Sequence, residues 1–131
     1  GWSLNFFWEN AHAPLYTVYT TFNQHLPLSI WASTWDAGFI TLLYLLLALL
    51  YRDFFWFRQL ALQKVLIIIG VSFLTATWVE LDALKKGKWA YEAMMPLMPW
   101  IEVGLTPFLQ LAIISLLTYK IVQRIANKMG W

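Results

Sequence analysis

The sequence predicts an all-α integral membrane bundle of about four transmembrane helices, in a single domain that covers residues 1–131. Composition is the first reason: 60% of the residues are hydrophobic, 18% are aromatic and only 12% are charged, whereas soluble domains carry roughly 25% charged residues. The second reason is that long uncharged segments alternate with short segments that hold the charges. Such a chain has too little polar surface to face water on all sides, so we expect lipid around it.

The helices follow from these uncharged segments. The segment before Pro14 reads as the second half of a helix whose start lies upstream of Gly1, and residues 20–33, which include Pro27, read as a connection. The uncharged runs in the other three segments cover residues 37–51, 65–79 and 103–119. A bilayer core needs about 20 helical residues, so the acids that border these runs must lie within the spans. The predicted helices are 1–19, 34–53, 61–84 and 99–125.

The placement of basic residues predicts the orientation, because cytoplasmic ends carry more lysine and arginine. Three lysines lie at one end of the predicted bundle: Lys85, Lys86 and Lys88. Twice as many basic residues lie at the other end: Arg52, Arg58, Lys64, Lys120, Arg124 and Lys128. We therefore expect a protein of the bacterial inner membrane with both termini in the cytoplasm.

Two function classes are excluded by the composition. The net charge is only +2 and no block of basic residues is long enough to follow a phosphate backbone, so nucleic acid is not an expected partner. The chain has no cysteine, which rules out disulfides, thiolate metal sites and cysteine nucleophiles.

The predicted topology brings carboxylates to one end of the bundle. Asp36 opens the second helix, Glu80 closes the third and Glu102 opens the fourth. Asn5, Glu9 and His12 share one face of the first helix, at spacings of four and three residues, with Trp8 beside them. A polar stripe on the fourth helix contains Glu102, Thr106 and Gln110. Because a lipid-facing carboxylate costs at least about 2.5–3.5 kcal/mol, these stripes should face one another.

The acids allow three interpretations. Polar groups between helices can simply be interhelical hydrogen bonds. The E-x-x-H spacing of Glu9 and His12 is typical of metal ligands, but a di-iron bundle needs that motif twice, so no metal is expected. The third interpretation is proton chemistry: a carboxyl group in an apolar aromatic pocket can protonate an alkene or an epoxide while aromatic rings stabilise the cation. Trp8, Trp78 and Trp89 lie close in sequence to the acids.

Two segments resemble enzymes of this chemistry. The residues Asn5-Phe6-Phe7-Trp8-Glu9 resemble the N-x-x-W-E motif of membrane-bound terpene cyclases, which implies that Glu9 is the proton donor. The residues Trp78-Val79-Glu80, Gly87-Lys88-Trp89-Ala90-Tyr91 and Pro99-Trp100-Ile101-Glu102 resemble lycopene cyclase domains, although the tandem acid of that pattern is reduced here to Glu102-Val103. The chain as a whole is similar to small bacterial multi-pass membrane proteins with an N-F-x-W-E…P-L-Y start, a resemblance that implies a fold but no activity.

We therefore expect acid-catalysed isomerisation or cyclisation of a polyprenyl or carotenoid-like lipid, without a cofactor. The expected catalytic residues are Glu9, Glu80 and Glu102. The expected substrate-binding residues are Asn5, Trp8, His12, Asp36, Trp78, Trp89 and Gln110. The alternative is a non-catalytic accessory subunit that binds lipid or pigment, with partner membrane subunits or further copies of itself.

Overall fold

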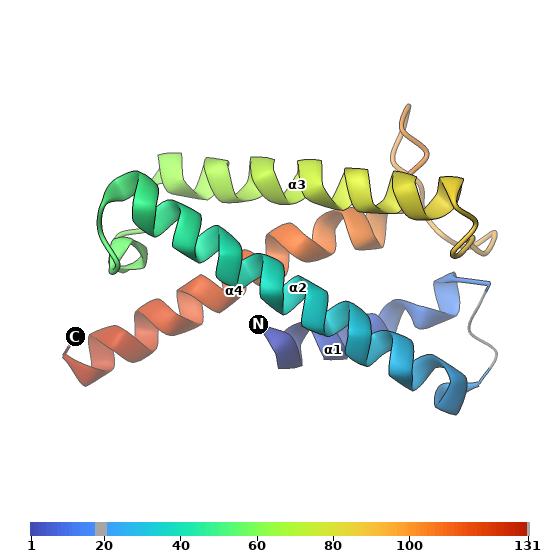
Figure 1. Cartoon of the computed structure of the whole chain (residues 1–131), viewed down its shortest axis with the longest axis horizontal. Coiled ribbons are helices and arrows are strands. Elements are labelled where there is room, and N and C mark those ends of the chain that lie inside the picture. The colour runs from blue at the N-terminus through green and yellow to red at the C-terminus, as the bar shows by residue number, and fades with distance from the viewer. Residues whose placement is uncertain (18–20, 131) are drawn as a thin grey trace.

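The computed structural model describes residues 1–17 and 21–130, and the chain is an all-α bundle. It consists of a short helix and three long ones, with two single turns of 3-10 helix between them (Figure 1). The elements are α1 Trp2–His12, η1 Ala13–Leu15, α2 Phe22–Tyr51, η2 Trp56–Arg58, α3 Leu62–Lys85 and α4 Leu105–Met129. Within the described residues, three helices are long and apolar enough to cross a membrane: His25–Tyr51 of α2, Leu62–Lys85 and Leu105–Met129.

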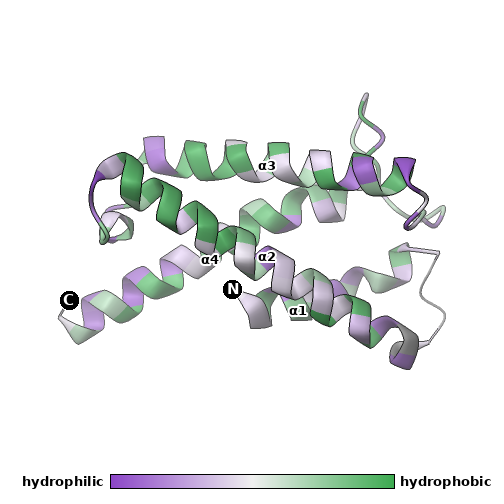
Figure 2. Ribbon diagram, viewed as in Figure 1, coloured by the Kyte–Doolittle hydropathy of each residue, from purple (hydrophilic) through white to green (hydrophobic). Residues whose placement is uncertain are grey.

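The long helices place the hydrophobic residues where a bilayer core would surround them. Figure 2 shows green, hydrophobic residues along the middle of α3 and the second half of α2, with purple, hydrophilic residues towards the ends of α3. α3 packs mainly against α4, and α1 packs mainly against α2 and also contacts α4. The buried positions of α3 include Ser72, Ala76 and Ala83, and small residues of this kind let two membrane helices approach closely.

Aromatic residues fill the end of the bundle where α2 and α3 are joined. The Trp56 side chain is 1% exposed, and its ring packs edge-on against Tyr119 of α4 with 5.1 Å between the centroids. Its indole nitrogen donates to the Tyr44 carbonyl oxygen at 3.1 Å. The ammonium of Lys64 donates to the carbonyl oxygens of Trp56 and Gln59, at 2.8 and 2.9 Å, which ties η2 to the start of α3.

Two helix starts differ from the prediction. α2 begins at Phe22, not at residue 34, and runs through Pro27; a proline in the second turn removes only one intrahelical bond, and membrane helices tolerate it. α4 begins at Leu105, not at residue 99. Gly104 caps this helix and Pro107 lies in its first turn, where the missing N–H has no partner to lose.

α1 is short and begins inside the bundle. It has 11 residues, too few to span a bilayer core, and Figure 1 shows the N-terminus near the middle of the molecule. A Cβ added to Gly1 would lie 3.3 Å from Cδ1 of Ile40 on α2 and 3.6 Å from the hydroxyl oxygen of Thr118 on α4. The predicted end of this first helix, at residue 19, lies outside the described residues.

Candidate functional site

A group of buried and half-buried polar side chains lies where α1, α2 and α4 meet, and we call Asn5, Glu9, His12, Asp36 and Gln110 the polar cluster. The Gln110 amide nitrogen lies 2.7 Å from Oε1 of Glu9 and 2.9 Å from Oδ2 of Asp36. It also lies 3.3 Å from the Asn5 carbonyl oxygen. An amide nitrogen carries two hydrogens, so the two shortest contacts join two carboxyl groups from different helices to one neutral donor.

α1 supplies the rest of the polar cluster from one face, as the spacing predicts. Asn5 is 0% exposed and its amide donates to the Gly1 carbonyl oxygen at 3.2 Å. His12 is 7% exposed, and its Nε2 lies 3.4 Å from Oε2 of Glu9, the oxygen that Gln110 does not contact. Both oxygens of the Glu9 carboxyl therefore have a partner, one neutral and one that can be protonated.

A second acid is held by the segment that follows α3, and we call Glu80, Trp89 and Tyr91 the loop cluster. Glu80 is 6% exposed. One of its carboxylate oxygens accepts the Trp89 indole N–H at 3.2 Å and the Tyr91 hydroxyl at 2.5 Å. The Tyr91 oxygen in turn accepts the Gly104 backbone N–H at 3.0 Å. Burial, and then the hydrogen bond to Glu80, raise the pKa of Tyr91, so this phenol keeps its proton and remains a donor.

Tyr16 joins the two clusters. Its ring lies edge-on to His12, with 5.4 Å between the ring centroids, and at 5.5 Å from the ring of Tyr91. The backbone fixes this contact, because the Thr17 N–H donates to the Ala90 carbonyl oxygen at 3.0 Å and the Glu92 N–H donates to the Leu15 carbonyl oxygen at 2.9 Å. The polar cluster and the loop cluster are therefore two ends of one continuous site walled by aromatic rings.

Not every predicted residue belongs to this site. Glu102 is exposed, with a left-handed φ of 53°, in the segment before α4. It cannot join Glu9 and Glu80 as expected, because α4 does not extend back to it. Trp78 is 68% exposed on α3, so it faces the surroundings and not the site. The Trp8 ring packs against the buried core, and its indole nitrogen is buried without a hydrogen-bond partner.

Sequence reasoning did not select Tyr16 and Tyr91. The alternation of Trp89 and Tyr91 was a usable signal, because residues two apart in an extended segment point the same way, and both donate to Glu80. Tyr16 carried no comparable signal for its contact with the loop cluster, since Trp89 and Tyr91 come from the segment that follows α3.

The structure gives no support to a metal centre. Over residues 1–17 and 21–130, no group of three or more His, Cys, Asp or Glu side chains is placed to hold a metal ion. The E-x-x-H pair of Glu9 and His12 makes a contact within the pair instead.

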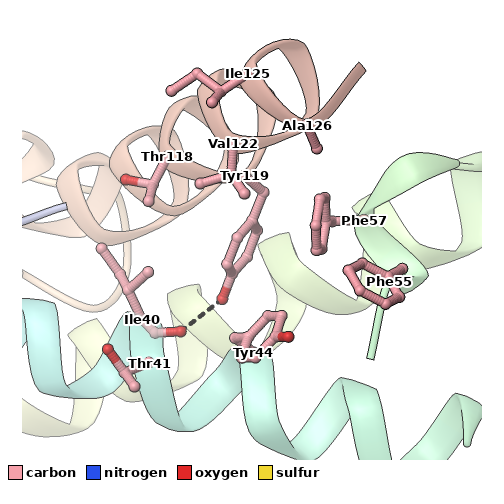
Figure 3. Close-up of a pocket in the computed structure, with 10 residues that line it drawn as sticks. All are labelled: Ile40, Thr41, Tyr44, Phe55, Phe57, Thr118, Tyr119, Val122, Ile125 and Ala126. Carbon is pink, nitrogen blue, oxygen red and sulfur yellow. Dashed lines mark hydrogen bonds between the residues drawn. The ribbon is translucent and has the colours of Figure 1, made fainter. Parts of the chain in front are cut away.

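An apolar groove with a volume of about 430 Å³ lies between α2 and α4 beyond the start of α1 (Figure 3). The Tyr119 hydroxyl donates to the Ile40 carbonyl oxygen at 2.7 Å, and the Tyr44 hydroxyl donates to the Phe54 carbonyl oxygen at 2.8 Å, so the groove presents mainly carbon. Ile40 lines the groove and lies beside Gly1, where an added Cβ would be 3.3 Å from the Ile40 Cδ1, and Gly1 is one helical turn from Asn5. The groove therefore begins close to the polar cluster.

Comparison of the chain with known protein families, with curated proteins and with solved structures finds no match in any of the three.

Proposed function

We propose that this protein isomerises or cyclises a polyprenyl or carotenoid-like lipid by acid catalysis within the membrane. One observation carries the proposal: Glu9 and Asp36, from different helices, share the side-chain amide of Gln110. A neutral amide can bind carboxylate oxygens but cannot neutralise their charge. The hydrogen bonds of Gln110 therefore leave open how the negative charge of the two carboxyl groups is compensated.

The charges of the polar cluster favour a shared proton. His12 is its only member that can be positively charged, and of the two acids it contacts Glu9 and not Asp36. With both carboxyl groups ionised, an uncompensated negative charge would lie inside a membrane bundle, at a cost of at least about 2.5–3.5 kcal/mol. A proton held by the pair removes that charge, and the same proton is available for transfer to a substrate.

The reaction that follows conserves mass. Glu9 gives its proton to an alkene carbon or to an epoxide oxygen, and the electron deficit moves to a neighbouring carbon. The rings of Tyr16, Trp89 and Tyr91 can stabilise this cation through their faces. Loss of a proton from an adjacent carbon to a carboxylate of the pair forms the new double bond and restores the acid. In this scheme Glu80 is a charge partner, and Asn5, His12 and Gln110 orient the acids.

The groove between α2 and α4 supports a hydrocarbon substrate. Its lining residues are mostly aliphatic and aromatic (Figure 3), and it starts one helical turn from the polar cluster. In this proposal a polyprenyl chain lies in the groove, and one of its ends passes the first turn of α1 to reach the acids.

The test is turnover by the purified protein. We expect wild-type protein, supplied with a set of isoprenoid alkenes and epoxides, to form a product of unchanged mass. Glu9→Gln keeps the hydrogen-bonding shape but lacks the proton, so it should lose turnover while staying folded. Glu102→Gln is the matched control, because Glu102 is exposed outside the site, and it should keep full turnover.

Two outcomes would overturn the proposal. Turnover by Glu9→Gln at the wild-type rate would remove the acid from the mechanism. If wild-type protein converts none of these substrates and leaves native membranes only with partners at fixed stoichiometry, the protein is a non-catalytic accessory subunit and the polar cluster is an interhelical contact.

A further inference from the structure

The segment between α3 and α4 contains a short hairpin, residues 96–104. Two backbone bonds of 2.7 Å close it, from the Met98 N–H to the Val103 carbonyl oxygen and from the Leu105 N–H to the Pro96 carbonyl oxygen. A third bond, from the Glu102 N–H to the Met98 carbonyl oxygen at 3.1 Å, closes the tip. The hairpin is thus an ordered element of the fold.

The base of the 96–104 hairpin is fixed to the bundle. Val103 is 0% exposed and Met95, just before the hairpin, is 5% exposed. Gly104 donates its N–H to the Tyr91 hydroxyl, and a Cβ at Gly104 would lie only 3.0 Å from the Met95 sulfur. This close packing sets the direction in which the tip leaves the bundle.

The tip presents apolar side chains outwards. Trp100 is 98% exposed and Leu97 is 49% exposed. Trp100 and Glu102 have φ angles of 70° and 53°, a left-handed conformation that costs a residue other than glycine roughly 1–2 kcal/mol. The chain therefore accepts backbone strain in a conformation that exposes its largest type of apolar side chain.

The direction of the hairpin indicates what covers this side chain. The spanning helices define the membrane normal, and in Figure 1 the tip of the α3–α4 connection projects sideways, across the direction of α3, near its C-terminal end. In a bilayer crossed by these helices, that position would lie at the boundary between lipid and water, where the amphipathic rings of tryptophan are enriched in membrane proteins. Lys85, Lys86 and Lys88 lie at the same end of α3 and mark the aqueous side.

We propose that the 96–104 hairpin is a membrane anchor that inserts Trp100 into the headgroup region of the leaflet beside the C-terminal end of α3. The ligand of this surface is the lipid interface itself and not a second protein. This proposal does not depend on catalysis. It also gives the strained tip a role, because the anchor holds Gly104 and thereby the hydroxyl of Tyr91 in the loop cluster.

The absence of cysteine makes a direct test possible. Single-cysteine variants labelled with an NBD fluorophore are reconstituted into vesicles of phosphatidylcholine and phosphatidylglycerol. Iodide quenches labels in water, and lipids with a nitroxide near the headgroup quench labels in the interface. Trp100→Cys is compared with Lys86→Cys, a residue expected in water, and with Leu74→Cys, which is 75% exposed in the middle of α3.

We expect iodide to quench position 100 several-fold less than position 86, and the shallow nitroxide to quench it more than position 74. Iodide quenching equal to that at position 86 would overturn the proposal, since the tip would lie in water. Protection from both quenchers would overturn it too, because a protein surface would then cover the tip.

A second variant separates the role of Trp100 from any insertion driven by the label. A label at Leu97→Cys, in the same hairpin, is read with Trp100 present and after Trp100→Ala. We expect iodide quenching at position 97 to rise several-fold when the indole is lost. Equal quenching in the two backgrounds would show that Trp100 does not anchor the hairpin.

Discussion

Tyr91 donates its hydroxyl hydrogen to Glu80 at 2.5 Å, and the same oxygen accepts the Gly104 N–H at 3.0 Å. One phenol thus links the end of α3 to the residue that caps α4. An unpaired carboxylate at position 80 would be costly in a membrane protein. Tyr91, which lies in the connection between α3 and α4, provides a hydrogen-bond donor for it. A shift of the α3–α4 connection would therefore change the hydrogen bonding of the Glu80 carboxyl group.

We predict that Tyr91→Phe destabilises the protein by about 1–3 kcal/mol, because the Glu80 carboxyl group loses one of its two donors and the Gly104 N–H loses its acceptor. The matched control is Tyr51→Phe, since the Tyr51 hydroxyl is buried without a hydrogen-bond partner. Unfolding by SDS in mixed micelles measures both variants. Equal midpoints for the two variants would contradict the prediction.

The raised pKa of Tyr91 predicts a pH dependence of this difference. Burial raises the pKa of Tyr91 most, and the hydrogen bond to Glu80 raises it further. In the unfolded chain tyrosine titrates near pH ~10; the folded pKa is higher, so the stabilisation is complete below pH ~10 and declines as pH rises towards the folded pKa. The gap in stability between wild type and Tyr91→Phe should be constant from pH 7 to 9 and shrink above pH ~10. A gap that widens with pH would show the opposite sign.

We predict that an acidic side chain at position 110 strongly destabilises the protein. Gln110→Glu replaces the donor that serves Glu9 and Asp36 with a third carboxyl group, and a buried charge left without compensation typically costs about 3–5 kcal/mol. Gln63→Glu, at an exposed position of α3, makes the same chemical change and should leave the unfolding midpoint close to that of wild type. Similar midpoints for the two variants would mean that the polar cluster is open to water.

Much of the polar cluster could be predicted from sequence, because helical spacing alone places Asn5, Glu9 and His12 on one face. The cost of a carboxylate in lipid also predicts that a distant polar side chain meets Glu9, and Gln110 does so across 101 positions of sequence. The prediction placed Glu102 in the fourth helix because hydropathy does not reveal a turn. Trp100 and Glu102 have left-handed φ angles, which a helix does not allow, so α4 starts only after them. Tyr91 was not selected, although its spacing of two from Trp89 predicts that both side chains point the same way in an extended segment; what the sequence did not predict is that they meet Glu80.

Two buried serines provide a test of which polar groups stabilise the bundle. Ser29 is 1% exposed and its hydroxyl lies 2.7 Å from Nε2 of His25, whereas Ser72 is 0% exposed and its hydroxyl has no partner. We predict that Ser29→Ala lowers stability by about 0.5–1.5 kcal/mol, the net value of a hydrogen bond. Ser72→Ala should leave stability unchanged or raise it. Loss of stability in Ser72→Ala alone would reverse the assignment.

The groove makes a prediction about chain length, because a bulky side chain inside it should shorten the hydrocarbon that fits. Ile125 lines the groove and is 52% exposed, and Ile121, on the same helix, is 45% exposed but does not line it. Under the proposed function, Ile125→Trp should reduce turnover of long polyprenyl substrates several-fold and spare short ones, while Ile121→Trp should affect neither. Rates are compared across substrates of increasing length with both variants in the same vesicles. A uniform loss at all lengths in Ile125→Trp would indicate damage to the fold, and unchanged rates would place the substrate chain outside the groove.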